Sequence, residues 1–346
     1  MSELALYRKY RPKAFSEVIG QDHIVKTLEG ALKLGHIFHA YLFAGSRGTG
    51  KTTLARIVAQ SIGASANDTY EIDAASNNTV DEMRVLNEAV SALPFESPYK
   101  VYIFDEVHMF SKSAFNALLK TLEEPPKHVV FILATTEIGK LPETVISRCQ
   151  VFRLKKPTRE ILKQSAAAIA KKEGFTLEAG AAELIALLGD GSFRDTQGIL
   201  QKIISASEDK KISLAEVETV TGAPKGSLVN GFVEALSGKA FEPALAALHG
   251  ALGAGVDAKV FLELVLQKLR FILLLRYAKE MEKEIANELS PEDFQFLKNL
   301  AGAKDSGISS ALLSELLAAY NSVGRAYIPA LPVELALMKL FHQSAS

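Results

Sequence analysis

The chain has 346 residues, of which 48% are hydrophobic and 23% charged, and its formal net charge at pH 7 is −1. This length predicts two or three domains, each large enough to bury its own core. The near-zero charge excludes a generally basic nucleic-acid binder, so any contact with DNA or RNA must come from a local patch. The single cysteine, Cys149, excludes an internal disulfide and any cysteine-based zinc cluster.

The sequence offers no membrane segment. The first residues, MSELALYRKYRPK, lack the uninterrupted apolar core of a signal peptide. The most apolar later segment, 260–275, is interrupted by charges and is too short to cross a bilayer. We therefore expect a soluble, cytoplasmic protein without a membrane partner.

The most informative stretch is GSRGTGKT, residues 45–52, which follows a predicted strand at Ala40–Phe43 and precedes a predicted helix at Thr53–Ser61. Its spacing is that of a phosphate-binding loop, in which glycines let backbone N–H groups converge on phosphate oxygens. Lys51 is expected to reach the β and γ phosphates, and the Thr52 hydroxyl to hold Mg²⁺. The candidate nucleotide-binding residues here are Gly45, Ser46, Arg47, Gly48, Thr49, Gly50, Lys51, Thr52 and Thr53.

Basic residues gather near the N-terminus in YRKYRPK, residues 7–13. This segment is either a solvated basic turn or a contact to a nucleotide, with Tyr7 and Pro12 flanking the base. Because Pro12 restricts the residue before it, we expect an extended segment rather than a helix. A turn and a helix from about Asp22 to Leu34 follow. The candidate nucleotide contacts of this region are Tyr7, Arg11, Pro12, Val18 and Ile19.

A strand at Thr69–Asp73 and a helix at Val80–Leu93 are predicted next. Asn77, Asn78 and Thr79 stand just before this helix. Asn78 or Thr79 fits a helix cap. The alternative is that this helix start also points N–H groups at a DNA phosphate, so the three residues are candidate DNA contacts.

An acidic pair follows the apolar run Val101–Phe104, which predicts a strand covered on both faces of a parallel sheet. Such sheets bind ligands at the carboxyl ends of their strands. Asp105 is expected to support Mg²⁺, through water, and Glu106 to polarise the water that attacks the γ phosphate. The alternative is an acidic turn that ends the strand. His108 is given no role, because a lone histidine is more often structural.

The remaining chain predicts more helix than strand. A helix at Ser111–Leu122 and strands at Val129–Ala134 and 151–154 are expected to complete the sheet domain. Thr135 and Thr136 either face the ligand edge or serve as a turn device.

From Thr158 the pattern is helical, and Ser192 is expected to cap a helix with Arg194 in its first turn. A cation there opposes the helix dipole, which suggests a nearby anion, although a surface arginine remains an alternative. After Gly226 the chain is expected to be all-helical, with one long helix at Ala258–Ala286.

These residues carry a resemblance to the gamma/tau ATPase subunits of the bacterial DNA polymerase III clamp loader, of the AAA+ class. It covers residues 1 to about 222, whereas the last third is similar only in helical character and in IPALPVELALMKL. The strings that carry it are, in order, YRKYRPKAFSEVIGQDH, GSRGTGKTTLAR, EIDAASN, KVYIFDEVHMFSKSAFNALLKTLEEPP, LATTE, SRC and GSFRD.

The resemblance implies an α/β P-loop (AAA+) sheet domain at 1–157, a small helical lid at 158–222 and an all-helical collar at 223–346 that joins subunits. It implies ATP and Mg²⁺ as ligands. The implied partners are further copies of the chain, delta and delta-prime type subunits, a sliding clamp and primer-template DNA, in a pentameric ring that loads the clamp.

The resemblance also implies three further site residues. Thr136 would sense the γ phosphate, and Arg194 would be the second sensor, on the lid. Arg148 of the SRC string would act in trans, as the finger that completes a neighbouring subunit's site.

Two departures from the family stand out. The family usually carries a four-cysteine zinc module before the EIDAAS strand, but here the interval is only SIGASANDTY, so zinc is not expected. The sequence stops at Ser346, so the extension through which the tau form reaches polymerase and helicase is not represented.

Two other functions remain as alternatives. One is a structural subunit of the delta-prime type, which shares SRC but has no need of the complete set Lys51, Thr52, Asp105 and Glu106. The other is an independent AAA+ DNA motor, such as a branch-migration helicase, against which the EIDAASN and EEPP strings argue.

Overall fold

The computed structural model describes residues 4–76, 80–207, 209–289, 291–303 and 305–342. Asn77, Asn78 and Thr79, the predicted DNA contacts, lie outside the described residues. The chain forms two compact units, residues 1–165 with 189–198, and residues 166–188 with 199–346. The division into three domains at 157 and 222 stays a prediction.

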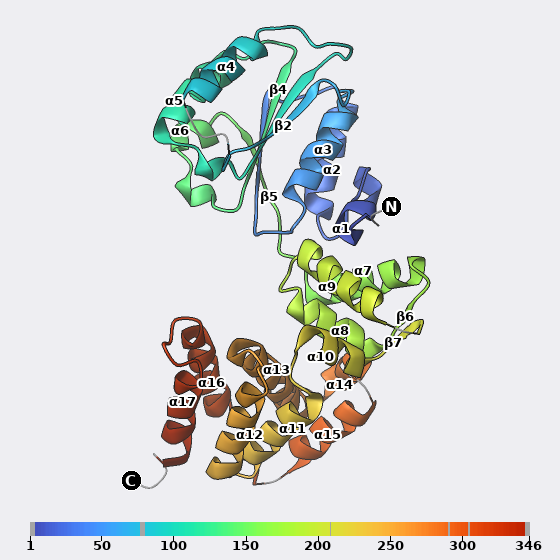
Figure 1. Cartoon of the computed structure of the whole chain (residues 1–346), viewed down its shortest axis with the longest axis vertical. Coiled ribbons are helices and arrows are strands. Elements are labelled where there is room, and N and C mark those ends of the chain that lie inside the picture. The colour runs from blue at the N-terminus through green and yellow to red at the C-terminus, as the bar shows by residue number, and fades with distance from the viewer. Residues whose placement is uncertain (1–3, 77–79, 208, 290, 304, 343–346) are drawn as a thin grey trace. The chain divides into compact units, whose positions relative to one another are not determined.

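The first unit is built on a parallel sheet (Figure 1). Its strand order is β2-β3-β4-β1-β5, so β4 lies between β1 and β3. The strands β1, β3 and β4 are continuous apolar runs because helices cover both faces of the sheet. The strands are β1 Ala40–Ala44, β2 Thr69–Asp73, β3 Lys100–Asp105, β4 Val129–Thr135 and β5 Gln150–Arg153.

Alternate residues of each strand enter two different cores. Leu42 of β1 packs with residues of α4–α6, whereas its neighbour Phe43 packs with residues of α2 and α3. The two helix layers are seen on either side of the sheet in Figure 1. These helices are α2 Asp22–Lys33, α3 Lys51–Ser61, α4 Val80–Val90, α5 Lys112–Glu123 and α6 Glu143–Ile146.

Shorter turns complete this unit. The expectation of an extended N-terminal segment is wrong for Leu6–Lys9, which forms a single helical turn, α1. Pro12 constrains only the residue before it, and Arg11 does lie outside that turn. The 3₁₀ turns are η1 Phe15–Glu17, η2 Val107–Met109 and η3 Ile138–Lys140.

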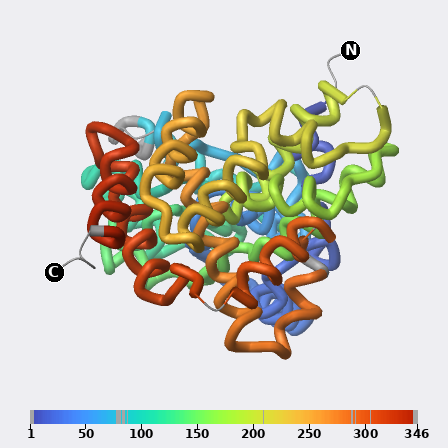
Figure 2. Tube along the Cα trace, turned by 90° about the horizontal axis from the view of Figure 1, so that it is seen from below, coloured from blue at the N-terminus to red at the C-terminus, as the bar shows by residue number. Residues whose placement is uncertain are grey.

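The rest of the described chain is mainly helical. Figure 2 shows α16 and α17 side by side, and their residues are in contact. A two-stranded parallel sheet, β6 Thr176–Leu177 and β7 Lys211–Ile212, was not predicted from the sequence. The helices are α7 Arg159–Lys172, α8 Ala179–Leu188, α9 Phe193–Ala206, α10 Leu214–Thr221, α11 Gly226–Ser237, α12 Phe241–Gly253, α13 Ala258–Tyr277, α14 Glu282–Glu288, α15 Pro291–Gly302, α16 Ser310–Val323 and α17 Leu331–His342, with the 3₁₀ turn η4 Lys279–Met281.

The predicted continuous helix at Ala258–Ala286 is wrong. The backbone leaves the helical region at Ala278, with φ −134° and ψ 73°, and resumes as η4 and α14. Alanine favours helix, so tertiary contacts override its propensity. The guanidinium of Arg276 donates to the carbonyls of Leu300, Ala301 and Ile308, which ties the end of α13 to the end of α15 and the loop after it.

No helix among the described residues is long and apolar enough to cross a membrane.

A buried carboxylate organises the loop between α4 and β3. Asp68 is fully buried and accepts hydrogen bonds from the backbone N–H groups of Phe95, Glu96 and Ser97, at 2.5, 3.0 and 3.0 Å. The hydroxyls of Ser97 and Ser65 donate to the same carboxylate, at 2.7 and 3.2 Å. Burial alone would raise the pKa of Asp68, but these hydrogen bonds to its charged form hold the pKa well below the ordinary value.

We expect Asp68→Asn to lower stability near neutral pH, because the amide cannot accept all five hydrogen bonds that the carboxylate accepts. A carboxyl whose pKa is depressed by folding contributes stability above its unfolded pKa of about 3.9 and loses it as pH falls through the folded pKa. The gap between the wild-type and variant urea midpoints should therefore narrow below about pH 4. Asp305→Asn, at an exposed site, is the control, and a gap that is constant with pH would contradict the assignment.

Candidate functional site

The phosphate-binding loop connects β1 to α3. Its first glycine continues the β1–β4 ladder, since the Gly45 N–H donates to the Thr135 carbonyl at 3.1 Å. Thr49 closes the loop by donating to the Ser46 carbonyl at 2.8 Å. Gly50, at φ +104°, turns the chain into α3, which begins at Lys51, two residues earlier than predicted. Ser46 and Arg47 are exposed, and Thr53 is half-buried in the first turn of the helix.

Lys51 is buried inside this loop, with 5% of the residue exposed. Its ammonium donates to the carbonyls of Gly45 and Ser46, at 3.0 and 3.1 Å, and lies 4.0 Å from Glu106 Oε1. Burial lowers the pKa of Lys51, and Glu106 and Asp105 oppose that shift. The two acids after β3 thus partly compensate a desolvated cation at the loop.

The predicted metal residues are in direct contact. The Thr52 hydroxyl donates to Asp105 Oδ2 at 2.9 Å. A hydroxyl and a carboxylate oxygen side by side are hard ligands that suit Mg²⁺, which usually takes few protein ligands and completes its shell with waters and phosphate oxygens. No group of three or more His, Cys, Asp or Glu side chains that could hold a metal ion lies among the described residues.

The Glu106 carboxylate, at the end of β3, is held by hydrogen bonds from the end of the neighbouring strand β4. Its carboxylate Oε2 accepts from the Thr136 N–H at 3.1 Å and from the Thr136 hydroxyl at 2.9 Å. Its backbone is left-handed, with φ 48° and ψ 45°, a conformation that costs about 1–2 kcal/mol in a residue with a Cβ. The structure therefore brings together Lys51, Thr52, Asp105, Glu106 and Thr136.

His108, to which the sequence assigned no role, belongs to the same cluster. Its side chain is 8% exposed, and Nδ1 lies 3.0 Å from Thr135 Oγ1 and 3.4 Å from Glu106 Oε2. Nε2 lies 3.6 Å from Glu137 Oε1. The string DEVH alone does not reveal these contacts, because they depend on the pairing of β3 with β4.

The N-terminus of α9 lies directly on the phosphate-binding loop. The Phe193 N–H donates to the Gly48 carbonyl at 3.0 Å. A Cβ at Gly48, whose φ is +72°, would stand 1.9 Å from the Ser192 hydroxyl. That hydroxyl caps α9 by accepting from the Asp195 N–H at 3.1 Å, as predicted. The sequence does not reveal that Gly48 is needed for this contact with Ser192 as well as for the conformation of the loop.

The first turn of α9 also carries Arg194, whose guanidinium carbon lies over the Tyr7 ring, 5.2 Å from the ring centroid. Arg11 is half-buried nearby, and its pKa is lowered first by burial and then by the charges of Arg56 and Arg194, whereas the charge of Glu71 opposes that shift. Cations that repel one another at short range favour an anion among them. Of the other predicted contacts, Pro12 and Val18 are half-buried and Ile19 is 51% exposed.

Gln21 is a second residue that sequence reasoning missed. It is 1% exposed, and its amide both donates to the Lys155 carbonyl at 2.8 Å and accepts from the Lys155 N–H at 3.1 Å. This pair fixes the segment that leaves β5 against the N-terminal end of α2.

Among the described residues, the structure records no contact between Arg148 and the residues of this cluster. It donates to the Thr144 carbonyl at 2.8 Å and to Glu123 Oε1 at 2.5 Å. Its side chain is 34% exposed, so the guanidinium lies at the surface of the first unit. An exposed ion pair of this kind contributes about 0–1 kcal/mol, so its exchange for another partner is inexpensive.

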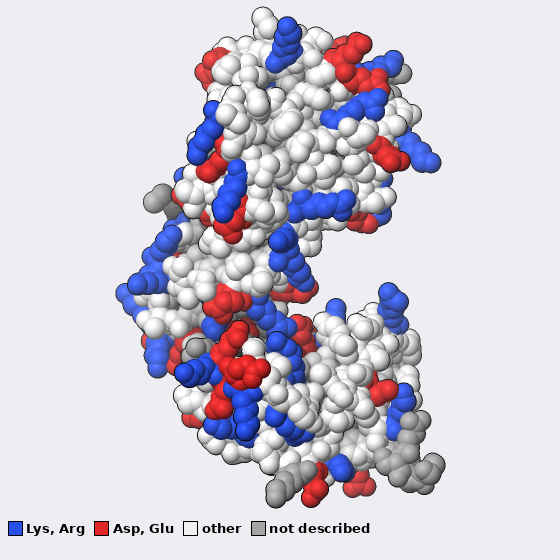
Figure 3. All heavy atoms as spheres, turned by 180° about the vertical axis from the view of Figure 1, so that it is seen from behind, with Lys and Arg blue, Asp and Glu red and all other residues white. Residues whose placement is uncertain are grey.

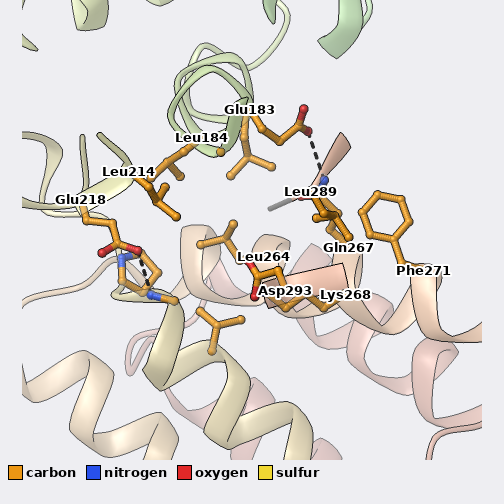
Figure 4. Close-up of a pocket in the computed structure, with 15 residues that line it drawn as sticks. Glu183, Leu184, Leu214, Glu218, Leu264, Gln267, Lys268, Phe271, Leu289 and Asp293 are labelled. Atoms are coloured by element: carbon orange, nitrogen blue, oxygen red, sulfur yellow. Dashed lines mark hydrogen bonds and ion pairs between the residues drawn. The ribbon is translucent and has the colours of Figure 1, made fainter. Parts of the chain in front are cut away.

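A small pocket of about 80 Å³ lies within the second unit (Figure 4). Its wall is mainly apolar, and its polar side chains have partners in the chain. Lys268 and Asp293 lie 2.7 Å apart, Gln267 donates to Glu183 at 3.1 Å, and Glu218 accepts from a backbone N–H at 2.8 Å. Burial raises the pKa of Glu218. None of the predicted site residues lines this pocket.

The approach of Gly48 to Ser192 yields a test. Gly48→Ala should destabilise the first unit and weaken nucleotide binding, because the new methyl displaces Ser192 in addition to straining a left-handed backbone. Gly35→Ala is the matched control, since Gly35 has the same φ of +72° with nothing within 4 Å of the added Cβ. Gly35→Ala should lower the free energy of unfolding by about 1–2 kcal/mol. Equal losses of stability in urea denaturation and of affinity in nucleotide titration for the two variants would contradict the contact between Gly48 and Ser192.

Family models match three parts of the chain. Residues 65–158 match the model for "DNA polymerase III, delta subunit", and residues 212–346 match "DNA polymerase III subunits gamma and tau domain III". Residues 14–103 match "Magnesium chelatase, subunit ChlI".

Among curated proteins, DNA polymerase III subunit tau of Bacillus subtilis is 41% identical over 86% of this chain and 56% of its own length. DNA polymerase III subunit tau of Escherichia coli is 36% identical over 85% of this chain and 51% of its own length. The chain thus spans about half the length of these relatives.

Among solved structures, the RuvB Holliday junction branch migration motor of Thermotoga maritima superimposes with a TM-score of 0.54. The superimposed region covers 70% of this chain and 85% of the RuvB chain, at 23% sequence identity. That likeness concerns the fold, which is an AAA+ sheet domain followed by helices. The curated relatives and the two matched DNA polymerase III models show that the chain belongs to the gamma/tau family of DNA polymerase III subunits.

Proposed function

We propose that the chain is an ATPase subunit of a clamp loader, which helps to place a sliding clamp on primed DNA during replication. The observation that carries this proposal is the convergence of Lys51, the Thr52–Asp105 pair and Glu106 at one edge of the sheet. A structural subunit of the delta-prime type has no need of this complete set. The family membership supports a role in replication.

The loop and its lysine account for triphosphate binding. The backbone N–H groups of 45–52 and the start of α3 offer donors and a positive helix end to phosphate oxygens. Lys51 now donates to two carbonyls of its own loop, and phosphate oxygens are stronger acceptors for the same ammonium. Tyr7, Arg11, Pro12, Val18 and Ile19 are proposed to hold the base and ribose side, and Arg194 the phosphates from the lid.

Hydrolysis needs a base for the attacking water. Glu106 is proposed to orient that water and take its proton, and Thr136, bonded to the same carboxylate, to sense the γ phosphate. Thr52 and Asp105 would hold Mg²⁺, which neutralises phosphate charge when bound. The absence of zinc stays an expectation from the sequence.

DNA contact is proposed to be local. On the face shown in Figure 3, Lys and Arg side chains are interspersed with Asp and Glu rather than gathered into one basic surface. The segment 77–79 stays the predicted phosphate contact. Delta and delta-prime type subunits, further copies of the chain and the clamp are the proposed partners, in the cytoplasm, and ATP cleavage is proposed to release the loader from the closed clamp.

The independent DNA motor is the second candidate, because the RuvB fold is similar. A likeness at 23% identity shows only the fold, whereas the curated relatives named above are 36–41% identical.

The test of the proposed function is the ATPase rate of the chain assembled with delta and delta-prime type subunits. We expect stimulation by primer-template DNA and the sliding clamp together, because a loader couples cleavage to its load. Glu106→Gln should bind ATP yet lose about 10²–10⁴-fold in turnover, the usual contribution of a general base. Stimulation by DNA alone, without any effect of the clamp, would favour the motor.

Arg148→Ala should spare ATP binding and lower the rate on the order of 10³-fold, as arginines acting in trans typically do. When Arg148→Ala chains are mixed with Lys51→Ala chains, the assembly should recover ATPase activity. The site of an Arg148→Ala chain is intact, and a Lys51→Ala neighbour supplies Arg148 to it. Arg153→Ala, at an exposed arginine of β5, is the matched control. A mixture as inactive as the separate variants would place the defect within one chain.

A further inference from the structure

We propose that His108 is a positioning residue for Glu106, which it holds, together with Thr135 and Thr136, in the orientation that hydrolysis requires. This inference rests on the proposed function, because it concerns how the base of that reaction is fixed.

Three groups lie close to one oxygen of the Glu106 carboxylate. Two of them, the N–H and hydroxyl of Thr136, lie 3.1 and 2.9 Å from Oε2. The third is the imidazole of His108, whose Nδ1 lies 3.4 Å from the same oxygen. A carboxylate can only accept, so the proposed role requires Nδ1 to carry a proton, which faces both this oxygen and the Thr135 hydroxyl.

The imidazole is itself fixed. It is 8% exposed, so it has little freedom to rotate away. Nδ1 lies 3.0 Å from the hydroxyl of Thr135, a fully buried residue whose Oγ1 also accepts from the Glu137 N–H at 3.0 Å. On the other side of the ring Nε2 faces Glu137 Oε1 at 3.6 Å. The end of β4 thus sets the ring that contacts Glu106.

The backbone of Glu106 explains why such support is needed. A left-handed glutamate persists only where its surroundings determine it, and strained residues of this kind concentrate at functional sites. His108 stands two residues further on, in the 3₁₀ turn η2, so the turn that strains Glu106 also returns the imidazole to its carboxylate. Free rotation of the carboxylate would misplace the attacking water, and small misplacements cost large factors in rate.

The test uses three variants of the assembled loader. His108→Asn places an amide N–H near the position of Nδ1, His108→Gln places it near that of Nε2, and His108→Leu removes both donors. We expect kcat to fall about tenfold to a hundredfold in His108→Leu and His108→Gln, the size expected for one hydrogen bond to a charged group, with recovery in His108→Asn. KM and ATP affinity should stay near wild type in all three, because Lys51 and its loop are untouched.

Several outcomes overturn the assignment. Equal kcat in His108→Asn and His108→Leu would reduce His108 to a packing residue, and a raised kcat in His108→Leu would mean that it restrains Glu106. If the His108 variants do not fold, Thr135→Val removes the hydroxyl that fixes the ring, and an unchanged kcat there overturns the proposal. Absence of turnover in the unsubstituted loader would overturn the proposed function itself, and this assignment with it.

Discussion

The parallel pairing of β4 between β1 and β3 is the constraint on which the candidate site depends. Ala44 is in register with Thr135, and Phe104 with Leu133, so three strands end at one edge. The loop after β1 carries the lysine, the end of β3 carries the acids, and the end of β4 carries two threonines that touch both neighbours. A shift in the β3–β4 register would separate the Thr136 hydroxyl from Glu106, and a shift in the β1–β4 register would separate the loop from Thr135.

Electrostatics then determines what the edge can hold. Lys51 is desolvated, and an unpaired buried ammonium would be costly. Two loop carbonyls and the nearby acids offset that cost, while the charge of Arg194 lowers the pKa of Lys51 further. Cations beside a pair of carboxylates are the setting in which we propose that an anion binds together with Mg²⁺.

Sequence reasoning predicted the parts of the structure that local strings encode. The strands of the sheet follow from residue type and spacing, and the structure contains them. The loop GSRGTGKT and the acidic pair follow in the same way, and the structure brings them together, while their roles stay predictions. What it missed depends on residues far apart in the chain. Ser192 meets Gly48, His108 meets Thr135, and Arg276 ends a helix early because it reaches the end of another. β6 and β7 have two residues each, too few for periodicity to show.

We propose that a triphosphate lies between the glycine loop and the acids at the end of β3. A crystal structure of the chain with Mg²⁺ and a non-hydrolysable ATP analogue tests this most directly. We expect the γ phosphate within hydrogen-bonding distance of Lys51 Nζ, with Mg²⁺ bound at Thr52 and near Asp105. Nucleotide bound elsewhere, or a loop in which Lys51 keeps both of its carbonyl partners, would contradict it.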